Sequence, residues 1–330
     1  MKSLKVACFV FTLFLSLVLS SYGFAIQKKT CVLTSLQCTY SIVNSLTGET
    51  SIDVFNVCPP GCRMDDQRYY FQKKEEEIRK YIQKADAVIT IRKVWKSDPL
   101  YIYTRKWNIR AIEIDASAPF DPALTGVALL DIPVCNDFSG TAEEQGFHVA
   151  DHNGKSVYVW LSLSNVSKMA DIIAADLKRL SPKDAGQIDK NLNGLKRKFF
   201  KLKIEYESRF VEIENLESFA LTDKFVYLTD NFNIHVVDCF VKPDFYWTKE
   251  DLINLKTALV RDEIKVVIHK WEPNAPIAQI IKEAGAKLAV LDSMDRCLDM
   301  NGKVDPDGYM KIMRKNLAAI AQAFEVSDKP

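Results

Sequence analysis

The residues with the clearest capacity for chemistry in this 330-residue sequence are its eight cysteines and four histidines. Cys58 and Cys62 enclose Pro-Pro-Gly, a spacing that can place two thiolates on one metal ion. A structural zinc site needs four ligands, and the sequence has no second cysteine pair of matching spacing. We therefore favour disulfide pairing over a zinc cluster for these cysteines.

Two of the histidines, His148 and His152, are four residues apart, and on a helix both imidazoles could reach one metal ion. Their polar, glycine-containing surroundings favour a loop, so they are possible accessory metal ligands, with exposed loop residues as the alternative. His235 and His269 fall within or at the end of apolar, strand-like segments. For these two we favour a satisfied core or strand-end histidine.

Catalytic motifs do not accompany these residues. The sequence contains no Gly-rich phosphate loop, no Gly-x-Ser-x-Gly elbow and no His-Glu-x-x-His motif. The 44 Lys and Arg against 43 Asp and Glu give a net charge of +1, so no overall field attracts a polyanion. The composition thus favours a binding protein over an enzyme or a nucleic-acid-binding protein.

The N-terminus has the pattern of a secretory signal peptide over residues 1–25. Lys2 and Lys5 precede an apolar stretch, and the small residues Gly23 and Ala25 suit cleavage after Ala25. An uncleaved anchor is the alternative, because the apolar stretch is only slightly shorter than the ~20 residues that span a bilayer. We expect an exported protein, periplasmic or extracellular.

Removal of this peptide leaves an odd number of cysteines, since Cys8 is lost and seven remain. In an oxidising compartment some should pair, and at least one should stay free or join another molecule. Their grouping suggests pairs within each half of the chain. Cys239 with Cys297 is the one pair that the C-terminal half offers.

The elements that position these residues alternate between strands and helices from residue 26 onward. Short apolar runs followed by helical patterns are typical of a parallel sheet covered by helices. In the first half we expect strands at 31–35, 51–57, 87–91, 111–114 and 157–161, and helices at 72–83 and 165–180.

A long helix is predicted from Ser181 onward. Apolar residues recur at spacings of four and three from Ile188 to Tyr206, which places them on one stripe. A helix of roughly 30 residues is roughly 45 Å long, enough to run along two lobes. A coiled-coil dimer is the alternative, but the stripe covers under three heptads and is interrupted by Arg-Lys-Phe-Phe, which favours packing within one chain.

A second α/β unit follows this helix. We expect a helix ending at 230, strands at 219–221, 234–239, 265–269 and 287–291, and helices at 248–260, 274–284 and 307–324. The predicted fold class is α/β, with two parallel-sheet lobes joined by one long rigid helix. The parts are a signal peptide (1–25), an N-terminal lobe (26–180), the connecting helix (181–216) and a C-terminal lobe (217–330). A ligand should bind between the lobes, at the carboxyl ends of the strands.

Several segments resemble, in order and spacing, the periplasmic zinc- and manganese-binding receptors of metal ABC transporters (cluster A-I type). They are YVWLSLSNVSKMADIIAADLKRLSP, the long helix, FALTDKFVYLTDNFNIHVVD, IKVVIHKWEPNAPIAQIIKEAGAKLAVLDSM, and PPGCRMDDQRYY followed by KADAVITI. The resemblance covers nearly all of the mature chain. It implies two α/β lobes, a transported metal in the cleft and an ABC permease in the membrane as partner.

The resemblance also implies positions for the metal ligands in the N-terminal lobe. Receptors of this family carry His shortly after Pro-Gly, and here that position is Asp65 or Tyr70. The family's His-Val-Trp-Leu becomes Tyr158-Val159-Trp160-Leu161, which puts Tyr158 in place of the second His.

In the C-terminal lobe the resemblance implies two further ligand positions. The His or Glu that opens the lobe's first helix is replaced by Thr222, followed by Asp223. Asp292 matches the family's last ligand, an Asp that ends a strand. With Asp65 and Asp66, these aspartates could form an oxygen site, which suits Mn or Ca better than Zn.

The replacements also point toward a different ligand. The hydroxyl groups of Tyr70, Tyr158 and Thr222, together with Arg92 and Lys93 after a predicted strand, suit a small polar or anionic ligand. Solvent-facing side chains are the alternative for the two basic residues. We thus expect a monomeric exported receptor that delivers Zn or Mn to a permease, without a catalytic cofactor. The alternative is the same fold binding a small polar or anionic ligand or a partner protein.

Overall fold

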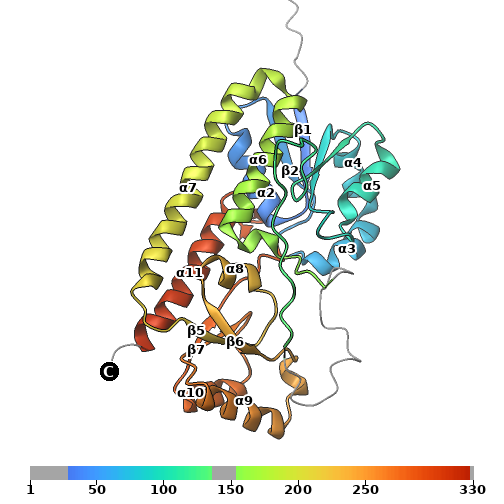
Figure 1. Cartoon of the computed structure of the whole chain (residues 1–330). Coiled ribbons are helices and arrows are strands. Elements are labelled where there is room, and N and C mark those ends of the chain that lie inside the picture. The colour runs from blue at the N-terminus through green and yellow to red at the C-terminus, as the bar shows by residue number, and fades with distance from the viewer. Residues whose placement is uncertain (1–28, 136–153, 328–330) are drawn as a thin grey trace, which may run out of the picture.

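The computed structural model describes residues 29–135 and 154–327, which contain two four-stranded parallel sheets (Figure 1). The first sheet has the order β2-β1-β3-β4, and the second has the order β6-β5-β7-β8. The strands of the first sheet are β1 (Thr30–Thr34), β2 (Ile52–Asn56), β3 (Ala87–Thr90) and β4 (Ile112–Asp115). The strands of the second sheet are β5 (Glu217–Ala220), β6 (His235–Cys239), β7 (Val266–His269) and β8 (Lys287–Val290). The predicted fold class of two α/β lobes is confirmed.

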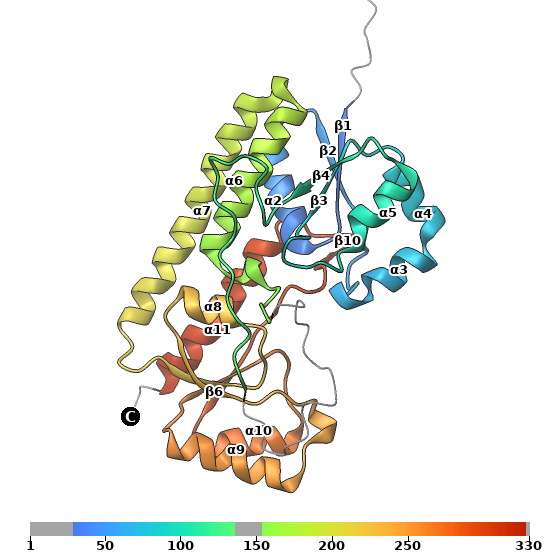
Figure 2. The ribbon, with the colours of Figure 1, turned by 45° about the vertical axis from the view of Figure 1, so that its right-hand side comes forward.

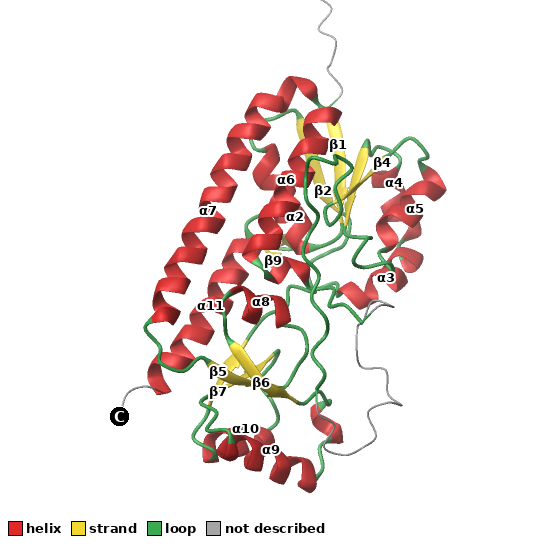
Figure 3. Cartoon of the chain, in the orientation of Figure 1, coloured by secondary structure: helices red, strands yellow, loops and turns green. Residues whose placement is uncertain are grey.

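Helices cover both faces of each sheet (Figure 3). In the first lobe they are α2 (Gln37–Thr47), α3 (Gln67–Lys73), α4 (Glu75–Ile82), α5 (Pro99–Trp107) and α6 (Leu163–Leu180). In the second lobe they are α8 (Val226–Asn231), α9 (Lys249–Arg261) and α10 (Ala275–Glu283). A short hairpin of β9 (Asp299–Met300) and β10 (Lys303–Val304) precedes the last helix, α11 (Gly308–Ser327).

The predicted long helix is α7 (Ala185–Val211), which has 27 residues and is roughly 40 Å long. It runs along one side of the molecule from the first lobe to the second (Figure 2). Its buried stripe contains the residues expected from the spacing, among them Ile188, Leu195 and Tyr206. The helix packs against α2, α6 and α11, so its apolar face is covered within the chain.

A second helix, α11, also connects the lobes. It follows the hairpin, and it contacts α2 of the first lobe as well as β7 and β8 of the second. One apolar core therefore extends through both lobes, from Val32 in β1 to Ile268 in β7. The positions of the predicted lobe boundaries stay predictions.

The segment predicted as a strand at 157–161 is not a strand. It forms a 3-10 turn over Val159–Leu161, preceded by Tyr158. All its side chains are buried, and the Trp160 indole N–H donates to the Ser293 carbonyl at 3.0 Å. The segment is apolar because it lies inside the hydrophobic core, although it does not pair with a sheet.

Two helices were missed and one was divided. No helix was predicted at α2 or α5, although Asp98 caps α5 by accepting from the Leu100 N–H at 2.9 Å. The helix expected at 72–83 corresponds to α4 and the last two residues of α3, with a break at Lys74, whose backbone leaves the helical region.

The predicted pairing of Cys239 with Cys297 is wrong. Cys239 forms a disulfide with Cys135, which lies between β4 and α6. Cys297 lies beside the first lobe, where its carbonyl accepts from the Gly61 N–H at 2.9 Å. The chain returns to the first lobe after β8, and this return separates Cys297 from Cys239.

Three sequence predictions lie outside the described residues: the signal peptide, His148 and His152. Among the residues that are described, no helix combines the length and the apolar character needed to cross a bilayer.

Candidate functional site

The candidate site lies where the two lobes meet, at the carboxyl ends of strands from both sheets. The loop after β2 contributes Asp65, and the turn after β5 contributes Asp223 and Lys224. Lys270 follows β7, and Asp295 follows β8. Parallel strands direct their carboxyl ends to one edge of a sheet, so side chains distant in sequence converge here.

The central contact joins Tyr158 of the first lobe to Lys224 of the second. The Lys224 amino group donates to the Tyr158 hydroxyl at 2.6 Å and lies 4.6 Å from the centre of its ring. Tyr158 is 3% exposed. Its backbone is held by the 3-10 turn that follows it, where the Leu161 N–H donates to the Tyr158 carbonyl at 3.0 Å.

The charges of three carboxylates raise the pKa of both residues in this contact. Burial raises the pKa of Tyr158 well above its usual range, and the charges of Asp295, Asp65 and Asp223 raise it further. Burial lowers the pKa of Lys224, while the charges of these same three aspartates raise it. We call Tyr158, Lys224 and the three aspartates the interlobe cluster.

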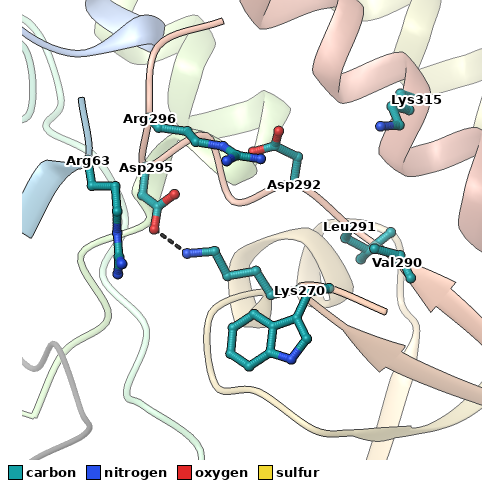
Figure 4. Close-up of a pocket in the computed structure, with 9 residues that line it drawn as sticks. Arg63, Lys270, Val290, Leu291, Asp292, Asp295, Arg296 and Lys315 are labelled. Atoms are coloured by element: carbon teal, nitrogen blue, oxygen red, sulfur yellow. Dashed lines mark hydrogen bonds and ion pairs between the residues drawn. The ribbon is translucent and has the colours of Figure 1, made fainter. Parts of the chain in front are cut away.

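Two further cations border the interlobe cluster. Lys270 forms an ion pair with the buried carboxylate of Asp295 (Figure 4). Arg63 lies 3.8 Å from Asp65 and lowers the pKa of Tyr158. The loop that carries Arg63 is fastened to the second lobe's return segment, because the Met64 N–H donates to the Asp295 carbonyl at 2.6 Å.

Thr222 and Asp292 serve the backbone around the cluster. The Thr222 hydroxyl accepts from the Lys224 backbone N–H at 3.4 Å, which supports the turn that carries Lys224. Asp292 accepts from the Met294 N–H at 2.7 Å, and its own N–H donates to the Asn316 side chain at 2.8 Å. Met294 has a φ of 55°, so the Asp292 carboxylate stabilises a left-handed turn.

A pocket of about 410 Å³ adjoins the interlobe cluster. Four basic and two acidic side chains line it, together with Trp271, Val290 and Leu291; the charged residues are Arg63, Lys270, Arg296, Lys315, Asp292 and Asp295 (Figure 4). Within the described part of the chain, Arg296 and Lys315 form no ion pair. The pocket therefore has a positive balance of charge.

Three predicted site residues make their contacts elsewhere. Tyr70 packs edge-on against Phe71, and burial raises its pKa to about 12, helped by the nearby Cys58. Arg92 forms a bidentate ion pair with Glu113 at 2.7 and 2.8 Å. The Lys93 backbone N–H donates to Asp115 at 2.7 Å. The structure thus brings together Asp65, Tyr158, Thr222 and Asp223, with Asp292 in the adjoining pocket.

Lys224 and Asp295 are the site residues that sequence reasoning missed. Asp295 follows Asp292 by three residues in a segment already assigned to the strand end, so its position was a usable signal. Lys224 gave no such signal, because a search for metal ligands passes over a lysine.

The donor atoms available for a metal in the interlobe cluster are oxygens. Carboxylate and phenol oxygens suit Mn²⁺ better than Zn²⁺, which favours imidazole and thiolate. Across the residues described, no three His, Cys, Asp or Glu side chains are grouped closely enough to hold a metal. In this structure the carboxylates of the cluster interact with the Lys224 amine. They would have to move closer together to bind a metal.

A neighbouring thiol pair lies at the start of the same loop. The Cys58 and Cys62 thiols form a hydrogen bond across the Pro-Pro-Gly turn. Burial raises the pKa of Cys58, and the hydrogen bond from Cys58 lowers the pKa of the more exposed Cys62. Both thiols are free, so the disulfide that we expected for these cysteines is not formed in the structure.

His269 at the end of β7 predicts a dependence of stability on pH. It is 2% exposed, its Nδ1 has no hydrogen-bond partner, and burial lowers its pKa to about 4. Since the folded pKa lies below the unfolded value near 6.5, His269 adds stability above pH 6.5 that is lost as the pH falls toward 4. We expect His269→Gln to remove roughly 2–3 kcal/mol of this pH-dependent difference.

Urea unfolding across this pH range measures the effect. The matched control is His235→Gln, because His235 is exposed on β6 and should keep the wild-type slope. Parallel pH profiles for wild type and His269→Gln would contradict the assignment.

Comparison with solved structures supports the fold. An FpvC mutant from Pseudomonas aeruginosa matches with a TM-score of 0.71 at 18% identity, covering 90% of this chain and 99% of that chain. FpvC in complex with Mn²⁺ matches with a TM-score of 0.66 at 18% identity, covering 91% and 100%. A Cd-bound periplasmic metal-binding protein from Candidatus Liberibacter asiaticus matches with a TM-score of 0.64 at 15% identity, covering 90% and 100%.

Sequence comparison gives the family. No curated protein matches the chain by sequence. The family model described as "Zinc-uptake complex component A periplasmic" matches residues 32–323, which include all of both sheets except the first two residues of β1, together with α7 and every residue of the interlobe cluster. The chain therefore belongs to the family of periplasmic component A proteins of zinc-uptake complexes.

Proposed function

We propose that this protein is the exported solute receptor of an ABC importer and that it captures a divalent transition metal of the Zn or Mn class between its lobes. It acts by binding its cargo and not by catalysis. A signal peptide cleaved after Ala25 delivers it to the periplasm or the cell exterior. There it works as a monomer and docks on a membrane permease.

Family membership supports this proposal, because the matched family is named for zinc uptake and for the periplasm. Similar folds have been solved with Mn²⁺, Ni²⁺ and Cd bound. In the described part of the second lobe the site residues lie on loops, and the strands form the frame that positions them, as is usual for binding sites.

The observation that carries the proposal is that carboxylates from both lobes act on one partly buried amine where the lobes meet. Asp65 comes from the first lobe, whereas Asp223 and Asp295 come from the second, and all three act on the Lys224 amine and the Tyr158 hydroxyl. Carboxylates placed in this way attract a cation, and a cation held between them joins the two lobes.

Calorimetric titration of the metal-stripped mature protein with Mn²⁺ and Zn²⁺ tests the proposal. We expect one metal per chain with a Kd below ~100 μM, or about 5.5 kcal/mol. Asp223→Asn should weaken binding at least about tenfold, because it removes a charged oxygen from the cluster. Asp53→Asn is the matched control, since Asp53 lies in β2 and pairs with Lys29. Failure of both metals to bind below ~100 μM would contradict the proposal.

The pocket beside the cluster favours a second candidate function, the binding of a small organic anion. Arg296 and Lys315 supply positive charge at its wall, and about 410 Å³ can hold a small carboxylate. The same titration with citrate in place of metal separates the two functions. Citrate binding that is lost in Arg296→Gln, without any binding of metal, would favour the second candidate.

A further inference from the structure

The side chain of Lys224 is an unusual occupant for a site that attracts cations. Its amine is partly buried where the lobes meet and donates to the Tyr158 hydroxyl at 2.6 Å. The turn that carries it is fixed by the Thr222 hydroxyl on the Lys224 backbone N–H. The position of the amine is therefore determined at both ends of the side chain, by Tyr158 at the amine and by Thr222 at the backbone.

The surroundings of the amine have the chemistry of a cation site. Removing an amine from water is costly unless acceptors and opposite charges replace the lost hydration. Here the Tyr158 oxygen accepts a hydrogen bond, the ring face lies 4.6 Å away, and three aspartates supply negative charge. An ammonium over an aromatic ring is itself a favourable arrangement.

With Lys224 present, the acidic and basic side chains in and beside the interlobe cluster are equal in number. Three acidic side chains, Asp65, Asp223 and Asp295, stand with three basic ones, Arg63, Lys224 and Lys270. A divalent metal added to this set would lie among three cations and would find no excess of negative charge. With the Lys224 amine removed, the same aspartates would exceed the remaining cations by one charge.

We propose that Lys224 is an internal cation that occupies the place of the cargo between the lobes, so that a metal binds only as the Lys224 amine withdraws. The inference rests on the proposed function, because it concerns the same site. Lys224 then sets the affinity and the selectivity of the receptor. Only a metal that gains more from Tyr158 and the aspartates than the amine does can displace it.

Two substitutions of Lys224 and one control substitution test the effect of its charge by Mn²⁺ and Zn²⁺ titration. Lys224→Gln should bind metal about tenfold or more tightly than wild type, because a repelling charge within a few Å is gone. Lys224→Arg keeps the charge and should bind no more tightly than wild type. The matched control is Lys256→Gln, which removes a lysine whose 2.6 Å ion pair with Glu283 lies on α9 and α10, away from the cluster. It should leave the Kd unchanged.

A measurement on the wild-type protein avoids dependence on variant folding. In metal-stripped protein the Lys224 amine is partly buried and hydrogen-bonded, so it should react slowly with an amine-reactive ester, as read by peptide mass spectrometry. Saturating Mn²⁺ should raise its labelling severalfold, while labelling of Lys256 stays constant. Labelling of Lys224 that falls or does not change on Mn²⁺ binding would overturn the inference.

The outcomes separate this inference from the proposed function. Equal Kd values below ~100 μM in wild type and Lys224→Gln would overturn the inference and leave metal capture in place. Metal binding by Lys224→Gln alone would support the inference and overturn metal capture by the natural protein. Absence of binding by both proteins at about 1 mM metal would overturn both.

Discussion

Replacing Cys135 and Cys239 together by serine is expected to lower the free energy of unfolding by about 2–5 kcal/mol. The disulfide joins residues 104 positions apart in sequence. A cross-link over such a long loop restricts the unfolded chain strongly, and the chain-entropy model gives about 4.7 kcal/mol for a loop of 100 residues. It also fastens the segment after β4 to β6, and therefore joins the two lobes.

Urea unfolding of the wild type and the double variant under non-reducing conditions measures this loss. Dithiothreitol provides a control within the same proteins, because it should destabilise the wild type and leave the double variant nearly unchanged. Non-reducing peptide mapping identifies the bond directly. A map that joins Cys239 to Cys297, or to any cysteine other than Cys135, would contradict the expected result.

The order of elements could be predicted from the sequence because the signals are local. The stripe of α7 follows from helical spacing, and the capping box of α9 is present as the residue types suggest, with Thr248 and Asp251 bonded reciprocally. Local signals failed at 157–161, where an apolar segment lies inside the core without pairing. Burial alone does not distinguish a buried turn from a buried strand.

The cysteine pairing could not be predicted because it depends on where distant segments lie. Cys297 belongs to the second half of the sequence, yet the chain after β8 returns to the first lobe and places it beside Asn56, whose amide donates to its sulfur at 3.4 Å. Cys135 lies between the elements of the first lobe and bonds to β6. Sequence proximity is a poor guide when two lobes exchange segments.

The sequence could suggest candidate site positions only where the family resemblance marks them, and it gave no indication of a side chain that the resemblance does not mark. The positions of Tyr158, Thr222 and Asp223 followed from the family resemblance, and the structure brings them together. The part played by Lys224 could not be predicted, because a lysine next to an aspartate is typical of an exposed turn. Only the packing of the lobes reveals that its amine is directed inward.

Trp160→Ala is expected to cost about 3–5 kcal/mol of unfolding free energy, since the largest buried side chain of the core would leave a cavity. The loss has a second part. The indole N–H, which donates to the Ser293 carbonyl at 3.0 Å, is removed. The Trp160 backbone carbonyl, which accepts from the Tyr309 hydroxyl at 2.9 Å, is kept in the variant. Trp160 thus connects the first lobe with the return segment and with α11.

Trp160→Phe is the matched variant for the hydrogen bond. It keeps most of the ring volume but leaves the buried Ser293 carbonyl without its donor, at a cost of about 1–3 kcal/mol. Urea unfolding of both variants separates the cavity from the hydrogen bond. The metal titration adds a functional readout, because Ser293 lies between Asp292 and Asp295 along the chain, and a shifted return segment would misplace Asp295. A Trp160→Ala protein as stable as Trp160→Phe would contradict this account, because the cavity would then contribute nothing.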